Sequence, residues 1–315
     1  MISHINTDFF LQLMQSRGGM LCMTTLAVFM LPLSGNIFVK IFNIIGCRII
    51  YQRVSFYYAV LSSVLLNFLI TVPVALLVYA FYNLVPFEIL YDVVILLFCL
   101  EFAGLRRYSM RVNHALRAGD TASAKTSLHP FVLREVSTLS SMGIAKAAVE
   151  SLPLNFISGW FIPAFWYMVL GANGAFAATM IVILNKSFSP KQPLFSDFGK
   201  FNSLLYRTVS LFPVCFLFMV FLFGRRTNIA LNCAFNSVRD HPYWLTGLVI
   251  GYIAGVMNIT LGGPRIYEGT KIRYNRIGLK TEPAPVHIVL TYKKMRNSVF
   301  IALLFIVIGQ SAWLL

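Results

Sequence analysis

The chain has 315 residues, of which 58% are hydrophobic and only 12% are charged, whereas a soluble domain carries about 25% charged residues. Its mean hydropathy of +0.74 excludes an ordinary water-soluble enzyme or binding domain. Lys and Arg number 26 against 11 acidic residues, so the segments between apolar stretches carry a large positive excess. The composition predicts an all-α, polytopic integral membrane bundle forming a single membrane domain over residues 1–315.

The first three apolar segments follow one another with short connections. Residues 20–38 are predicted to be an anchor and not a secretory signal, because they lack a small-residue cleavage site. Residues 54–82 carry no charge and exceed the roughly 20 residues that a bilayer core requires. Residues 84–105 follow after a very short turn. We expect the second and third segments to form an antiparallel transmembrane hairpin.

Basic residues flank this expected hairpin on both sides. Because cytoplasmic loops of membrane proteins are enriched in Lys and Arg, we expect both ends of the hairpin to lie in the cytoplasm, with the N-terminus outside. The basic residues are Lys40, Arg48 and Arg53 before the hairpin and Arg106, Arg107, Arg111 and Arg117 after it.

The same enrichment is one explanation of the overall positive charge. The other is that some of these cations bind an anionic substrate, for which Arg is well suited by its planar set of donors. We expect the chain to lie in a lipid bilayer, the bacterial cytoplasmic membrane, with no nucleic-acid partner. Association into a homo-oligomer stays open.

Residues 106–150 are predicted to form a basic, helical cytoplasmic loop. The next apolar stretch, residues 155–184, is interrupted by Pro163 and by a segment that contains Gly171 and Gly174, and it is too short for two complete spans. We expect a broken or re-entrant helix pair. Irregular backbone at membrane depth is tolerated only where protein or a watery cavity surrounds it, so a cavity is predicted along this stretch.

The rest of the chain holds apolar segments at 204–224, 244–261 and 298–315 and a basic loop at 264–297. Because all connecting loops here are basic, a simple serpentine cannot place each of them on the cytoplasmic side. Either one segment does not cross, with the helix that contains Pro213 the first candidate, or one basic loop lies outside.

Neither a transition-metal site nor a transporter fold is indicated. The five cysteines form no C-x-x-C pair, and no two of the five histidines have ligand spacing on one helix. No inverted repeat, which is typical of many transporters, is found.

A series of short motifs is recognisable from the middle of the chain onward. The motifs are Ala115-Leu116-Arg117-Ala118-Gly119-Asp120, Leu133-Arg134-Glu135, Ala147-Ala148-Val149-Glu150-Ser151, Pro163-Ala164-Phe165-Trp166 and Leu261-Gly262-Gly263-Pro264. Their order and spacing over about residues 115–278 resemble those of the adenosylcobinamide-phosphate synthase family, the CobD/CbiB membrane proteins of cobalamin biosynthesis.

The resemblance implies an activity, which is the ATP-dependent ligation of aminopropanol or its phosphate to a side-chain carboxylate of the corrinoid adenosylcobyric acid. It also implies ATP and Mg²⁺ as cofactors if the ligase activity is retained. Glu135 and Glu150 are then the expected catalytic residues. The expected substrate-binding residues are Arg134, Asn155, Trp166, Arg265 and Tyr267.

The chain departs from the family pattern at several carboxylates. The residues that replace them are Leu154, Ser158, Asn185 and the pair Tyr206-Arg207. Because Mg²⁺ is bound by oxygen ligands such as carboxylates, these losses support an alternative, a catalytically degenerate member that serves as a membrane sensor, scaffold or binding protein. The matching glycines and prolines are explained equally by tight turns and close packing.

Overall fold

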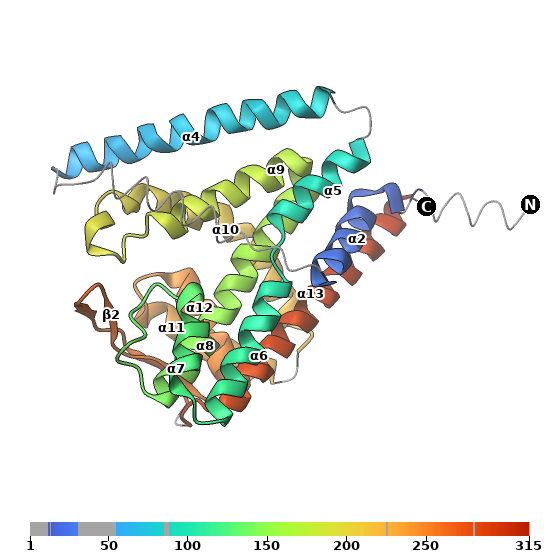
Figure 1. The fold of residues 1–315 in the computed structure, drawn as a ribbon. Helices are drawn as coiled ribbons and strands as arrows, with labels where there is room; N and C mark the ends of the chain where they lie inside the picture. The colour runs from blue at the N-terminus through green and yellow to red at the C-terminus, as the bar shows by residue number, and fades with distance from the viewer. Residues whose placement is uncertain are drawn as a thin grey trace, which may run out of the picture.

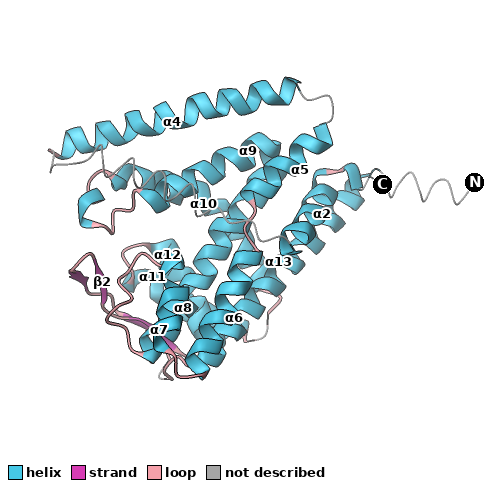
Figure 2. Cartoon of the chain, in the orientation of Figure 1, coloured by secondary structure: helices cyan, strands magenta, loops and turns pink. Residues whose placement is uncertain are grey.

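The computed structural model describes residues 12, 14–30, 55–84, 88–224, 226–279 and 281–314. The described chain is almost entirely helical, with small two-stranded sheets at one end of the molecule (Figure 2), so the expected all-α membrane fold is confirmed. The helices are α2 (Arg17–Met30), α4 (Phe56–Leu84), α5 (Glu88–Cys99), α6 (Ala103–Arg117), α7 (Thr121–Leu128), α8 (Ser141–Phe156), α9 (Ile162–Ser187), α10 (Gly199–Phe221), α11 (Thr227–Asp240), α12 (Trp244–Met257) and α13 (Pro285–Leu314). The strands are β1 (Thr260–Gly262), β2 (Arg265–Tyr267), β3 (Thr270–Ile272) and β4 (Arg276–Gly278).

Four helical segments in this described part are long and apolar enough to cross a membrane. α4 shows why lipid is the suitable solvent, since it is apolar around its whole circumference, and its Phe68 and Leu69 are 67% and 70% exposed. An apolar surface of this extent would drive association in water, whereas lipid solvates it. The four segments cover residues 56–82, 141–187, 199–221 and 285–312.

The helix that contains Pro213, the first candidate for a segment that does not cross, is among these four by length and composition. α10 contains Pro213 and is 23 residues long. The proline does not end this helix, since neighbouring helices and local adjustments make proline tolerable in a transmembrane helix. The segments 84–105 and 244–261 instead yield α5 and α12, of 12 and 14 residues. Each is shorter than the roughly 20 residues of a full span.

The expected antiparallel hairpin of segments 54–82 and 84–105 is not formed along its length. The two helices touch near their connection, where Tyr91 donates a hydrogen bond of 3.0 Å to the Val78 carbonyl. From there α4 packs on α9 and α10, while α5 packs on α9 and α2, and Figure 1 shows them diverging. Packing against other helices therefore overrides the short connection.

Segment 84–105 is also not one helix, because it breaks between α5 and α6. At the break the Glu101 N–H donates a hydrogen bond of 2.8 Å to the Gly159 carbonyl. Gly159 lies in a π-helical turn, Ile157–Phe161, a distortion that releases backbone groups from the regular helical ladder. A Cβ at Gly159 would lie 3.2 Å from the Glu101 oxygen, so glycine permits this close approach.

The stretch 155–184 is broken, as the sequence predicts. Besides the π-helical turn it contains Gly171, whose backbone is non-helical (φ 74°, ψ −163°). Ser158, before this residue, and Asn185, after it, line the same cavity. The chain therefore reverses at Gly171 and returns toward its starting point as a re-entrant pair.

The helical structure that leads into the stretch 155–184 begins earlier than expected, inside the predicted loop 106–150. α8 starts at Ser141, and its Ile144, Ala145 and Val149 are fully buried. α8 packs against α6 and α13, so the end of the predicted loop is part of the protein core. Its alanines are small and only weakly apolar, which is why hydropathy alone does not reveal their burial.

The predicted basic loop 264–297 is partly folded. Strand β1 pairs with β4 and β2 pairs with β3, both antiparallel, and α13 begins at Pro285. The predicted segment 298–315 is thus the second half of a longer helix. α13 packs beside α2 (Figure 1).

The structure describes only part of the N-terminal region for which the sequence makes predictions. The anchor 20–38 forms a helix up to residue 30, and residues 31–38 lie outside the described residues. So do Lys40, Arg48 and Arg53, on which the predicted orientation depends.

Candidate functional site

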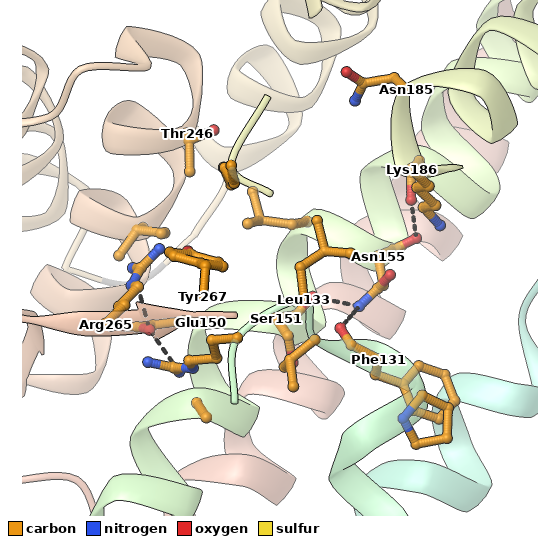
Figure 3. A pocket seen from close by; sticks show the side chains of 18 of the residues that line it. Phe131, Leu133, Glu150, Ser151, Asn155, Asn185, Lys186, Thr246, Arg265 and Tyr267 are labelled. Carbon is orange, nitrogen blue, oxygen red and sulfur yellow. Dashed lines mark hydrogen bonds and ion pairs between the residues drawn. The ribbon is translucent and has the colours of Figure 1, made fainter. Parts of the chain in front are cut away.

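A cavity of about 230 Å³ lies where α8, the two arms of the re-entrant pair, α10, α12 and β2 meet. A second cavity of about 100 Å³ adjoins it and shares part of its wall, including Lys186, Lys191, Tyr206 and Thr246. The lining of the first is seen in Figure 3, with Glu150 and Arg265 at one side and Asn155 and Lys186 at the other. The predicted cavity along the stretch 155–184 is therefore present.

Glu150 is the centre of a buried ion-pair cluster at the base of the first cavity. Its Oε2 lies 2.8 Å from Arg134 Nη2 and 3.2 Å from Arg265 Nη2. Its Oε1 accepts a hydrogen bond of 2.7 Å from the Gly262 N–H. The side chains of Glu150, Arg134 and Arg265 are only 4%, 9% and 7% exposed. One carboxylate thus holds two guanidinium groups at the cavity wall.

The local structure explains how these groups meet. Glu150 lies on the face of α8 that also carries Ala147, Ser151 and Leu154, at the i, i+3 and i+4 spacing of one helix face. The backbone of Gly262 has φ +76°, and a Cβ there would collide with the Asn275 carbonyl. Glycine at this position lets β1 turn so that its N–H reaches Glu150.

The combined lining of the two cavities is strongly basic. Lys191 is partly buried in the cavity wall, and this burial lowers the pKa of its ammonium group, as do the other cations nearby. Burial alone would raise the pKa of Tyr267, but Lys191 and Arg265 beside it lower that pKa below its usual value. Both effects indicate a positive potential. In the described part of the lining, the cationic side chains are Arg134, Lys186, Lys191, Arg207 and Arg265, and the one carboxylate is Glu150.

His241 lies beside this cluster and is held neutral. Its ring stacks on Tyr274 with centroids 5.2 Å apart, and its Nδ1 accepts a hydrogen bond of 3.1 Å from the Tyr243 N–H. Burial, and then the positive charges of Arg265 and Lys191, lower its pKa to about 4. A proton on this ring would add to an already positive region.

The structure brings five of the seven predicted site residues into the first cavity: Arg134, Glu150, Asn155, Arg265 and Tyr267. The Asn155 side chain donates to the Phe131 carbonyl at 3.2 Å and to the Ser151 carbonyl at 3.0 Å. It therefore ties the loop after α7 to α8.

The other two predicted residues do not line either cavity. Glu135 accepts a hydrogen bond of 2.6 Å from the Gly269 N–H, which fastens its loop to the turn between β2 and β3. Trp166 donates a hydrogen bond of 3.0 Å to the Val209 carbonyl of α10. In this geometry Glu135 and Trp166 join elements of the fold, and neither reaches the cavity.

Three cations were missed as site residues, because Lys186 and Lys191 belong to an ordinary basic connector of the sequence and Arg207 lies inside the apolar segment 204–224. Lys186 ends the re-entrant pair, Lys191 lies in the loop after it, and Arg207 lies on α10. A signal was nevertheless present, since the residues that stand where the family pattern has carboxylates all line one or both cavities. These are Leu154, Ser158, Asn185, Tyr206 and Arg207.

A divalent metal held by protein carboxylates does not fit this site. No group of three or more His, Cys, Asp or Glu side chains suited to a metal is found among the described residues. Of the described residues that line the two cavities, Glu150 alone has a carboxylate, and both of its oxygens already accept from a guanidinium or an N–H. Mg²⁺ requires several oxygen ligands, which these side chains do not supply.

Comparisons with known proteins point to one family. A family model described as CobD/Cbib protein matches residues 27–295. The chain is similar to "Cobalamin biosynthesis protein CobD" of Sinorhizobium sp, with 28% identity over 59% of this chain and 60% of that protein. The protein of the same name from Rhizobium meliloti is 30% identical, with 58% of each chain covered. In Stutzerimonas stutzeri the identity is 26%, over 70% of this chain and 73% of the relative.

The first two of these matches span about three fifths of the relatives' lengths. No solved structure matches the fold.

Proposed function

We propose, from the premise that this chain belongs to the CobD/Cbib family, that its basic cavity binds the substrates of an amide-forming step of cobalamin biosynthesis at the cytoplasmic membrane. In that step aminopropanol or its phosphate is joined to a side-chain carboxylate of adenosylcobyric acid. The new C–N bond replaces a C–O bond of the carboxylate, and ATP supplies the phosphoryl group that leaves with the oxygen.

The observation that supports this proposal best is the pair of buried guanidinium groups at Glu150. Arginine binds carboxylates and phosphates through paired N–H groups, and the substrates carry both kinds of anion. Arg134 and Arg265 are held by one carboxylate, so the pair retains a net positive charge toward the cavity. Glu150 then acts by positioning, since its oxygens are engaged with these cations and with the Gly262 N–H.

Cavity size restricts what can be enclosed. About 230 Å³ is below the roughly 300–1,000 Å³ of pockets that enclose drug-sized ligands. A corrinoid macrocycle is larger than such ligands, so only its reacting side chain can enter while the ring stays at the mouth. The aminopropanol, in contrast, is small enough to be enclosed.

A second candidate function is binding without ligation, as in a sensor or scaffold protein. It is favoured by the side chains at Leu154, Ser158, Asn185 and Tyr206, which line the cavity at positions where the family pattern has carboxylates. Because these side chains cannot replace acidic metal ligands, no step is assigned to a protein-held Mg²⁺.

Complementation separates the two functions. A bacterial strain without its own synthase is supplied with cobyric acid and with this protein, whose presence in the membrane is checked by immunoblot. Growth supports ligation, and growth lost in Arg265→Gln but kept in the exposed control Lys271→Gln assigns it to the cavity. No growth with the protein present refutes ligation. Thermal stabilisation by a corrinoid without growth supports the binding function.

A further inference from the structure

We propose that the smaller cavity is a phosphate-binding subsite which balances the charge of its ligand with Lys and Arg side chains instead of a protein-held divalent cation. This inference rests on the proposed function, because it assigns a ligand class to one part of the same site. The occupant is a phosphate or pyrophosphate group, either free or as part of a larger substrate.

The size of this cavity suits such a group. Its volume is about 100 Å³, well below the roughly 300–1,000 Å³ of pockets that enclose drug-sized ligands. A phosphate group fits this space, whereas a nucleoside or a macrocycle does not. The shared wall with the first cavity lets the remainder of a phosphorylated substrate extend into the larger space.

Two cations at this cavity are held by an aromatic ring and not by a carboxylate. Lys191 Nζ lies 5.2 Å and Arg207 Cζ lies 4.7 Å from the centroid of the Tyr243 ring. Neither residue is in any of the ion pairs of the described part of the chain. A ring face fixes the direction of a cation but does not neutralise it, so both charges remain available to an anion.

Buried donors without partners point the same way. Within the described residues, Arg207 Nε and Arg265 Nε are buried and have no hydrogen-bond partner. Arg265 itself is 7% exposed and lines the first cavity, while Arg207 lines the second. An unsatisfied buried donor is costly, and charge-assisted hydrogen bonds to a phosphate would satisfy it.

The absence of acidic side chains from the lining decides between a metal-assisted and a metal-free subsite. Among the described residues no Asp or Glu lines the smaller cavity, and Glu150 in the larger one is already engaged. A divalent cation would add charge to five nearby cationic side chains and would find few oxygen ligands. An anion without a bound metal ion, in contrast, would be surrounded by cationic side chains in this cavity.

The test is titration calorimetry of the full chain in detergent with inorganic phosphate and with pyrophosphate, in EDTA and again with Mg²⁺. Binding is expected in EDTA without loss of affinity. Because hydrogen bonds to charged groups are among the stronger ones, Lys191→Gln and Arg207→Gln are each expected to weaken it by about tenfold or more. The matched control Lys271→Gln, an exposed lysine of β3, should leave the affinity unchanged.

If Arg207→Gln fails to fold, Arg207→Lys is measured in its place. This variant keeps the positive charge, so we expect it to retain binding of the anion. The inference is overturned if binding requires Mg²⁺, if wild type binds neither anion, or if Lys191→Gln and Arg207→Gln bind as well as wild type does. Its failure is distinct from that of the ligase proposal. Growth with Mg²⁺-dependent binding refutes only the metal-free subsite, and metal-free binding without growth refutes only ligation.

Discussion

Replacement of Glu150 by Gln is the most informative single change in this protein. The substitution keeps the shape of the side chain but removes the charge that lies 2.8 Å from Arg134 and 3.2 Å from Arg265. Two guanidinium groups that are less than a tenth exposed would then face each other without a counter-charge. Breaking a buried ion pair by removing one partner costs about 3–5 kcal/mol, and we expect a loss of stability in that range for Glu150→Gln.

The matched control is Glu135→Gln, which is the same substitution in the neighbouring loop. Glu135 accepts one exposed hydrogen bond, from the Gly269 N–H, so its replacement should cost about 1 kcal/mol or less. Unfolding of both variants in detergent micelles is followed by near-UV circular dichroism during a denaturant titration. Equal stability of the two variants, within about 1 kcal/mol, would refute the assignment of Glu150 as the counter-ion of the buried cluster.

Three further predictions concern pH, backbone packing and helix association. Burial and nearby cations lower the pKa of His241 to about 4, so its ring binds a proton more readily in the unfolded chain. Stability should therefore fall as pH drops from about 6.5 to about 4. Melting temperatures measured across this window should not show that fall in His241→Gln. Gly199→Ala should destabilise by about 1–3 kcal/mol because its Cβ would overlap the backbone of the preceding loop, whereas Gly309→Ala, which meets nothing within 4 Å, should not; equal melting temperatures would contradict this. Asn67 on α4 donates a buried hydrogen bond of 2.6 Å to Asn202 on α10, so a double-mutant cycle to Ala should measure a coupling of about 0.6–1.7 kcal/mol; zero coupling would exclude this contact.

The cavity explains why the family resemblance and the departures from it belong together. Glu150 and the Gly262 N–H remain in contact, so the framework that orients Arg134 and Arg265 is intact. Around it stand neutral or basic side chains at positions where the family pattern, as the sequence resembles it, has acidic residues. On the proposed function, such a site binds anions through Arg134 and Arg265 and offers few oxygen ligands to a divalent cation, which is why binding and ligation must be tested separately.

Composition and hydropathy by themselves determined the membrane fold, because a long run of uncharged apolar residues such as 54–82 has the same preference for lipid in any tertiary context. They also identified the interruption at Gly171, since a glycine-rich segment inside an apolar stretch weakens a helix locally. Motif order identified Glu150 and its partners as candidates. These are properties of neighbouring residues, and so they can be read along the chain.

Only the tertiary structure decided which charges meet. The contact between Glu150 and Gly262 joins residues 112 positions apart, and Lys191 and Arg207 reach one ring of Tyr243 from a loop and from α10. No local pattern records such distances, because they depend on how the re-entrant pair folds back and how α10 and α12 pack beside it. Basic residues that look alike in the sequence therefore separate into exposed ones such as Lys271 and partly buried ones such as Lys191, which line a cavity.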